Sequence, residues 1–129
     1  MILVDSSVWV DSFKSQSGPA GTALRRMIEE GEPLVLTGIV IAEVLQGLTR
    51  DAARIERLLA QWDFIEPKGF ETYRRAAVLY REARARGISL STIDTLIASI
   101  ALDHRASVFT IDQDFTRIAR LTRLELYAF

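Results

Sequence analysis

Short, almost wholly apolar segments alternate along this chain with longer segments whose apolar residues recur at helical spacing. The clearest short segments are Ile2–Val4, Leu34–Leu36 and Val108–Ile111. A strand that is apolar at successive positions has both faces buried, which is typical of a parallel sheet lying between helices. The order of these segments therefore predicts an α/β fold with a mostly parallel sheet.

The remaining segments complete this prediction. Phe64–Ile65 and Leu124–Tyr127 add two short strands, so that a sheet of about five strands is expected. Helices are expected in the segments Val8–Phe13, Leu24–Ile28, Ile39–Leu48, 51–62, 70–86, Ile93–Ala101 and Phe115–Leu121. A chain of 129 residues without an internal repeat or linker suits one domain over residues 1–129, arranged as a three-layer α/β/α sandwich.

Composition excludes several classes of protein. The chain has no cysteine, so it forms neither disulfides nor a thiolate metal site. The apolar segment after Met1 is shorter than a secretory signal requires, and no apolar run is long enough to span a bilayer. These features favour a cytoplasmic location. Every lysine or arginine position except Lys14 and Lys68 carries arginine, a side chain suited to phosphates, although a solvated helix face is the simpler explanation for any single arginine.

Two aspartates directly follow predicted strands. Asp5 comes after Ile2–Val4, and Asp112 comes after Val108–Ile111. Because parallel strands end at the same edge of a sheet, and ligands bind at that edge, both side chains are expected there. Taken singly, each aspartate also suits a turn or a helix cap.

Two further acids lie on the apolar faces of predicted helices. Glu43 shares a face with Ile39 and Val40, and Asp94 shares a face with Ile97. No lysine or arginine lies within one turn of Asp94, so its burial as an ion is costly unless another cation pairs with it.

A divalent metal ion would offset both the cost of burying these acids and their mutual repulsion. Oxygen ligands without cysteine point to a hard ion such as Mg²⁺ or Mn²⁺. We therefore predict a metal site formed by Asp5, Glu43, Asp94 and Asp112, whose chemistry suits phosphoryl transfer. The neighbouring hydroxyl of Thr110, like that of Ser6, either positions water or phosphate or serves only the local backbone.

Four motifs in order resemble those of PIN-domain proteins, and the resemblance covers essentially the whole chain. They are Val4–Trp9, Thr37–Glu43, Ser91–Ala98 and Thr110–Phe115. The short length and the Leu96-Ile97-Ala98 sequence are similar to VapC-type toxins of bacterial and archaeal toxin–antitoxin pairs.

This resemblance implies a PIN-domain-like sandwich and a metal-dependent endoribonuclease that cleaves tRNA or ribosomal RNA. Asp5, Glu43, Asp94 and Asp112 would be the catalytic residues and the ligands of Mg²⁺ or Mn²⁺. It also implies a homodimer and a small cognate antitoxin, which occupies a groove near the acidic pocket and supplies the DNA binding. Asp114 either binds a second ion or caps the helix that begins at Phe115.

Other functions remain open on the sequence. One is a PIN-type nuclease in RNA processing outside a toxin pair, and another is a non-catalytic interaction module with the same fold. A phosphate-accepting receiver module is disfavoured because neither Lys14 nor Lys68 follows a strand directly.

Several side chains near these motifs are candidates for binding RNA. Trp9, Trp62, Tyr73 and Tyr80 either stack on bases or, more simply, belong to the core or a dimer interface. His104 is expected at a helix end, with no catalytic role. Eight arginines either flank the acidic pocket or form a solvated face: Arg50, Arg54, Arg57, Arg74, Arg75, Arg81, Arg84 and Arg86.

Overall fold

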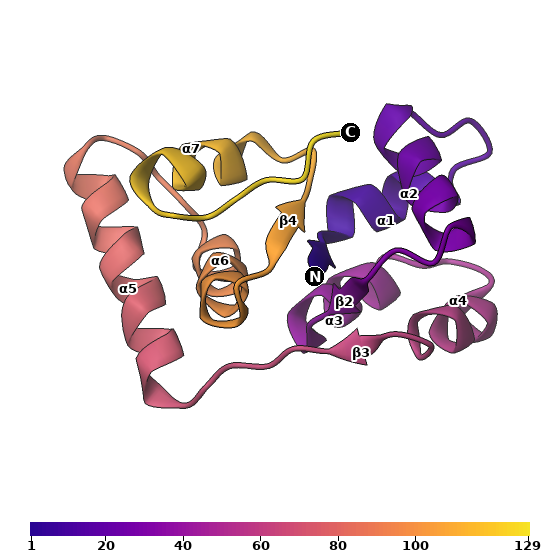
Figure 1. Cartoon of the computed structure of the whole chain (residues 1–129), viewed down its shortest axis with the longest axis horizontal. Coiled ribbons are helices and arrows are strands. Elements are labelled where there is room, and N and C mark those ends of the chain that lie inside the picture. The colour runs from indigo at the N-terminus through magenta and orange to yellow at the C-terminus, as the bar shows by residue number, and fades with distance from the viewer.

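The computed structural model describes all of residues 1–129 and has a four-stranded parallel sheet at its centre (Figure 1). The strands are β1 (Ile2–Val4), β2 (Leu34–Leu36), β3 (Asp63–Phe64) and β4 (Ser107–Phe109), in the order β3-β2-β1-β4. Leu3 in β1 pairs with Val35 of β2 on one side and with Val108 of β4 on the other. The predicted α/β architecture with a parallel sheet is confirmed.

Helices cover the sheet on both sides. They are α1 (Ser6–Phe13), α2 (Pro19–Glu29), α3 (Gly38–Gln46), α4 (Ala52–Leu59), α5 (Phe70–Ala85), α6 (Thr92–His104) and α7 (Gln113–Leu121). Figure 1 shows α5, α6 and α7 on one side of the strands, and α1, α2 and α4 on the other. Helix α3 contacts both α1 and α4. Between the layers, the largest fully buried side chains are those of Trp9, Phe109 and Phe115.

The predicted fifth strand is present only as a single bridge. Leu126 forms an isolated parallel bridge with Val108, and the backbone N–H of Tyr127 donates to the carbonyl of Val108 at 2.9 Å. The sheet therefore has four strands, not five. Strand β4 also ends two residues earlier than expected, at Phe109, because the Thr110 side chain turns toward Asp5 and accepts a hydrogen bond from the backbone N–H of Asp112.

Helix α4 is shorter than the predicted 51–62, and β3 begins one residue earlier than expected, at Asp63. Ala60 and Gln61 form a turn in which their backbone N–H groups donate to Glu56 and Leu58. This turn directs the chain from the end of α4 into the edge strand.

Helices α1 and α2 approach closely at Gly21. A Cβ atom placed on Gly21 would lie 2.7 Å from the carbonyl carbon of Asp11, closer than packed carbon atoms tolerate. The buried Asp11 carboxylate accepts hydrogen bonds from the backbone N–H groups of Gly18, at 3.3 Å, and Gly21, at 2.8 Å. This contact orients α1, the helix that directly follows Asp5.

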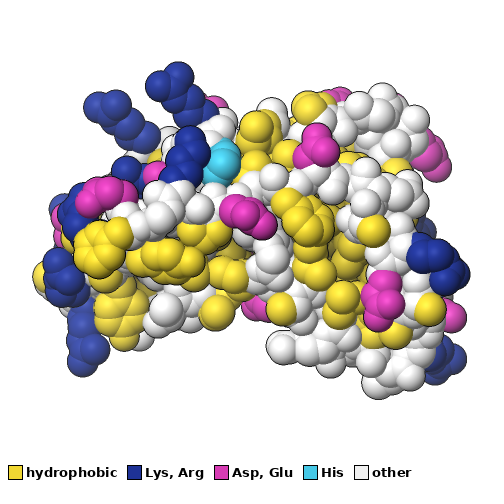
Figure 2. Space-filling view, turned by 90° about the horizontal axis from the view of Figure 1, so that it is seen from below, with side chains coloured by type: hydrophobic (Ala, Val, Ile, Leu, Met, Phe, Trp, Pro, Cys, Tyr) yellow, Lys and Arg dark blue, Asp and Glu magenta, His cyan; other side chains and the backbone are white.

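Figure 2 shows one face of the molecule, with basic side chains gathered at its two ends and hydrophobic side chains between them. Large exposed hydrophobic residues of the chain include Phe70 and Tyr73 of α5, which are 79% and 53% exposed. No helix is both long enough and apolar enough to cross a membrane.

Candidate metal centre

The parallel pairing of β1 and β4 brings the connection after β4 beside Asp5. Val4 pairs with Phe109, and the backbone N–H of Asp5 donates to the carbonyl of Phe109 at 2.9 Å. Asp5 and Asp112 therefore leave the same edge of the sheet, as the sequence predicted. Asp5 is only 4% exposed, so its carboxylate depends on protein groups or a bound ion to replace water.

Two hydroxyl groups donate hydrogen bonds to the same carboxylate oxygen of Asp5. The hydroxyls of Ser7 and Thr110 donate to Asp5 Oδ2, at 2.7 Å and 3.0 Å. The sequence predicted Thr110 as a neighbour of the site but did not predict a role for Ser7 there. Its place two residues after the acid, in Asp5-Ser6-Ser7, is the signal that identifies it in retrospect.

Helix α6 carries Asp94 in its first turn. The side chain of Ser91 caps this helix by accepting a hydrogen bond from the backbone N–H of Asp94 at 3.0 Å. The Asp94 carboxylate is half-buried, and its pKa is raised to about 6, first by burial and then by the nearby charge of Asp112. Asp5 and Asp114 raise the pKa further in the same direction.

Glu43 reaches the same pocket from α3. Burial raises the pKa of its carboxyl above the ordinary value, followed by repulsion from Asp5 and, more weakly, from Asp112. The hydroxyl of Ser6 donates to Glu43 Oε1 at 3.3 Å, which favours the ionised form and opposes this shift. The charges of Glu43 and Asp94 therefore both interact with those of Asp5 and Asp112.

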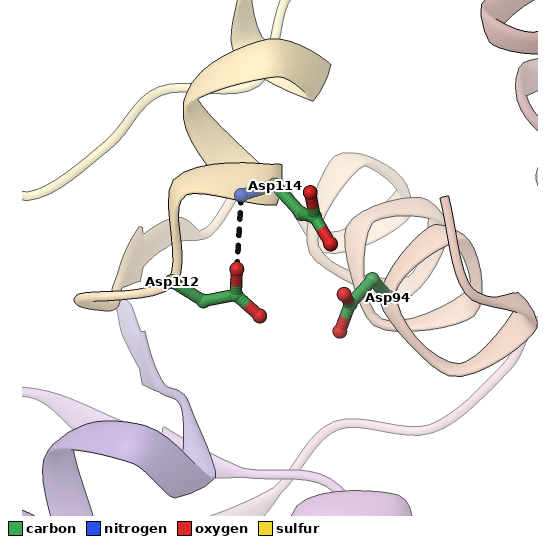
Figure 3. A group of neighbouring side chains, drawn as sticks. All are labelled: Asp94, Asp112 and Asp114. Carbon is green, nitrogen blue, oxygen red and sulfur yellow. Dashed lines mark hydrogen bonds between the residues drawn. The ribbon is translucent and has the colours of Figure 1, made fainter. Parts of the chain in front are cut away.

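Asp94, Asp112 and Asp114 form the tightest acidic group, with one carboxylate oxygen from each lying within 4.8 Å of the others. Figure 3 shows that their side chains point into a common space from α6 and from the start of α7. Asp5 and Glu43 lie outside this innermost group, although they repel its members.

Asp112, and not Asp114, caps the last helix. Asp112 Oδ1 accepts a hydrogen bond from the backbone N–H of Asp114 at 2.9 Å, and α7 begins at Gln113 (Figure 3). The suggestion that Asp114 caps a helix beginning at Phe115 was therefore wrong. The Asp114 carboxylate instead pairs with Arg117 at 2.6 Å.

Ion pairing separates the four predicted acids from Asp114. Asp5, Glu43, Asp94 and Asp112 have no lysine, arginine or histidine within ion-pair distance, whereas Asp114 has Arg117. An uncompensated group of partly buried carboxylates is costly in a folded protein. The donor set consists only of carboxylate and hydroxyl oxygens, which fits a hard divalent cation.

Two of the four proposed RNA-stacking residues, Trp9 and Trp62, pack against each other. Trp9 is fully buried, and its ring centroid lies 5.3 Å from that of Trp62. Tyr73 and Tyr80 instead line an open pocket of about 370 Å³ between α5 and α6. His104 lies at the far end of α6, about 15 Å along the helix from Asp94, and its Nε2 contacts the carbonyl of Glu66 at 2.7 Å.

The eight arginines predicted as candidates for RNA binding divide into two groups. Arg54, Arg74 and Arg75 form ion pairs with Asp51, Glu71 and Asp103, as expected for stabilising helix surfaces. The others form no ion pair: Arg50, Arg57, Arg81, Arg84 and Arg86. Of these, Arg81 lines the pocket between α5 and α6 together with the two tyrosines.

The chain is similar to proteins of one known family. The sequence model of the PIN domain matches residues 2–121. Ribonuclease VapC11 of Mycobacterium tuberculosis is 34% identical over an alignment that covers 100% of this chain and 99% of the relative. A VapC ribonuclease of Mycobacterium bovis has the same identity and coverage.

Solved structures share the fold at lower sequence identity. VapBC2 of Rickettsia felis, solved with a fragment of its promoter DNA, superposes with a TM-score of 0.76 at 20% identity, covering 100% of this chain and 99% of that chain. FitAcB of Neisseria gonorrhoeae gives a TM-score of 0.72 at 20% identity, covering 99% and 97%. With a family match over nearly its whole length and full-length relatives at 34% identity, the chain belongs to the PIN-domain family, among the VapC ribonucleases.

Proposed function

We propose that this protein is a Mg²⁺- or Mn²⁺-dependent endoribonuclease and the toxin of a toxin–antitoxin pair. The ion would be held by Asp5, Glu43, Asp94 and Asp112. The observation that carries the proposal is the convergence of these acids at one edge of the sheet without any cationic partner. The ribonuclease names of the full-length relatives support the choice of substrate.

Asp94 is the residue that a cation would affect most. Its pKa of about 6 reflects a carboxylate that burial and neighbouring charge make unfavourable. A divalent cation reverses both effects, because it replaces lost hydration and neutralises Asp112 at the same time. Asp114 lies beside Asp94 and Asp112 but pairs with Arg117, so the proposed ligand set keeps the four acids that have no cationic partner.

An ion held by Asp5, Glu43, Asp94 and Asp112 would supply Lewis-acid chemistry suited to phosphodiester hydrolysis, including a lower pKa for a nearby water molecule. The protein contributes fixed positions. Asp5 and Asp112 are attached to neighbouring strand ends, and Asp94 is attached to a capped helix. Fixed ligands avoid the reorganisation that mobile side chains would need in the transition state.

An RNA substrate needs positive charge to offset the acids of the pocket. Arg81 and Arg84 of α5, and Arg86 directly after it, have no ion-pair partners and are exposed, so they are free to contact phosphates. We propose tRNA or ribosomal RNA as the substrate class, in the cytoplasm.

The proposed partners are a second copy of this chain and a small cognate antitoxin. The exposed Phe70 and Tyr73 of α5, beside the pocket between α5 and α6, support a homodimer because large apolar side chains are rarely left in water. Solved neighbours in complexes with DNA support an antitoxin that supplies the DNA contacts. In this proposal the chain itself reaches DNA only through that antitoxin.

Cleavage of total RNA by the purified protein tests the catalytic part of the proposal. We expect cleavage with Mg²⁺ or Mn²⁺, none in excess EDTA, and none by Asp94→Asn. Asp63→Asn is a matched control, because Asp63 is exposed and forms no ion pair. Cleavage by the wild-type protein that persists in excess chelator would exclude the metal mechanism.

The toxin role needs a separate test in cells. Expression of this chain alone should arrest growth, Asp94→Asn should remove the arrest, and co-expression of the adjacent upstream gene should rescue growth. Normal growth in the presence of active nuclease would favour an RNA-processing nuclease outside a toxin pair.

A further inference from the structure

Two hydroxyl groups from distant parts of the chain converge on one oxygen of Asp5. Ser7 Oγ lies 2.7 Å and Thr110 Oγ1 lies 3.0 Å from Asp5 Oδ2. We propose that Ser7 and Thr110 are positioning residues, which leave Asp5 Oδ1 as the single ligand oxygen of this carboxylate and fix Asp112 relative to it. This inference deepens the proposed function and rests on its metal site.

The direction of each hydrogen bond follows from the partners. The backbone N–H of Ile111 donates to Ser7 Oγ at 3.3 Å, and the backbone N–H of Asp112 donates to Thr110 Oγ1 at 2.9 Å. A backbone N–H can only donate, and an ionised carboxylate can only accept. The single hydrogen of each hydroxyl is therefore directed at Asp5 Oδ2.

The same contacts join the two chain segments that carry the site. Each hydroxyl lies between the Asp5 carboxylate and the backbone of residues 110–112, the connection from β4 to α7. Displacement of this connection by an ångström would break the bonds to Asp5 and would move Asp112 with it. The position of one proposed ligand is thus tied to the position of the other.

The bonds also determine which oxygen of Asp5 is available. Oδ2 accepts two hydrogen bonds, which use its two lone pairs, while no protein group donates to Oδ1. Because Asp5 is 4% exposed, the surrounding protein leaves little room for water to replace either hydroxyl. An ion would therefore meet a carboxylate with one free oxygen in a fixed orientation.

This geometry changes the role considered for Thr110 in the sequence. Its hydroxyl hydrogen is directed at Asp5, so it is not available to orient an attacking water or a phosphate. Ser6 makes a single and longer bond, 3.3 Å, to Glu43 Oε1 and does not contact the connection that carries Asp112. We therefore assign the positioning role to Ser7 and Thr110 and not to Ser6.

The test is the affinity of the purified full chain for Mn²⁺, measured by isothermal titration calorimetry together with thermal unfolding in EDTA. Removing groups that orient metal ligands typically weakens affinity by about 10- to 100-fold. We expect a weakening of this size in Thr110→Val and in Ser7→Ala. Thr110→Ser, which restores the hydroxyl, should stay within about threefold of wild type.

Thr122→Val is the matched control. Thr122 Oγ1 likewise accepts a hydrogen bond from the backbone N–H two residues later, that of Leu124 at 3.1 Å, but it donates to the carbonyl of Ile118 and touches no acid. Its loss should lower the unfolding temperature without changing Mn²⁺ affinity. Should Thr110→Val fold poorly, comparison of Ser7→Ala with the wild type and with Thr110→Ser decides the question.

Two results would overturn the inference in distinguishable ways. If the wild type binds Mn²⁺ and both Thr110→Val and Ser7→Ala bind it equally well, the hydroxyls are merely structural and the metal site stands. If the folded wild type binds no Mn²⁺, the proposed metal site fails and this inference fails with it.

Discussion

Replacing Asp94 by asparagine should stabilise the metal-free protein while abolishing its activity. The substitution keeps the shape of the side chain and removes the charge. In the absence of an ion, that charge is unfavourable because Asp94 is half-buried and close to Asp112. Asp94 is therefore required for the proposed reaction but destabilises the metal-free protein.

The size of the effect follows from the pKa of Asp94. Burial and neighbouring charge raise this pKa from 3.8 to about 6. Since each tenfold change in proton affinity corresponds to about 1.4 kcal/mol, the ionised form is disfavoured by at most about 3 kcal/mol. Solvent screening at this half-buried position reduces the expected gain to about 1–2 kcal/mol, or roughly 3–8 °C in unfolding temperature.

The pH dependence has a definite sign. Because the folded pKa of Asp94 is raised, its contribution favours the folded state below pH 3.8 and is lost as the pH rises through about 6. Thermal unfolding in EDTA should therefore show little difference between wild type and Asp94→Asn at pH 4, and the full difference at pH 7.

Mn²⁺ should reverse the order of stability. At a concentration 100 times its dissociation constant, the ion should stabilise the wild type by about 2.7 kcal/mol and leave Asp94→Asn unchanged. Asp103→Asn is a control on the same helix, because Asp103 pairs with Arg75 and its loss should destabilise the protein. A variant at position 94 that is less stable than wild type at pH 7 in EDTA would refute the reasoning.

Two other perturbations test separate features of the structure. Mn²⁺ affinity should fall about tenfold per pH unit below about pH 6, because the ion must displace the proton of Asp94. Calorimetry between pH 5 and 8 measures this affinity, and a constant value over that range would contradict the prediction. Gly21→Ala should destabilise the protein by about 1–3 kcal/mol in urea unfolding, because its Cβ would lie 2.7 Å from Asp11. Gly38→Ala, whose Cβ would meet open space, should have no such cost, and equal effects of the two would contradict the packing argument.

The sequence predicted the central strands well because their apolar residues are contiguous and the fold buries both faces of the sheet. Leu3 and Val108 are both fully buried, as expected. The last strand was overpredicted, since the apolar pattern of Leu124–Tyr127 does not reveal that only Leu126 reaches the edge of the sheet. Pairing at an edge depends on tertiary contacts that a local pattern does not contain.

For the site, the sequence predicted which acids lie near one another but not how they are held. The strand-end position of Asp112 and the apolar helical face of Asp94 were sufficient to place both at one edge. The pairing of Asp114 with Arg117 follows a simple three-residue spacing and was overlooked. The contact of Thr110 with Asp5 joins residues 105 positions apart, so no local rule indicates it.

The acidic pocket also receives the beginnings of three helices. Asp5 directly precedes α1, Asp94 lies in the first turn of α6, and Asp112 directly precedes α7. The amino end of a helix carries partial positive charge from its aligned peptide dipoles, which stabilises a nearby anion by about 0.3–1 kcal/mol. Helices α1 and α7 directly follow β1 and β4, so their amino ends lie at the carboxyl edge of the sheet, whereas α6 follows α5 and leads into β4. The backbone thus supplies a diffuse positive field that lessens the repulsion among the acids before any ion arrives.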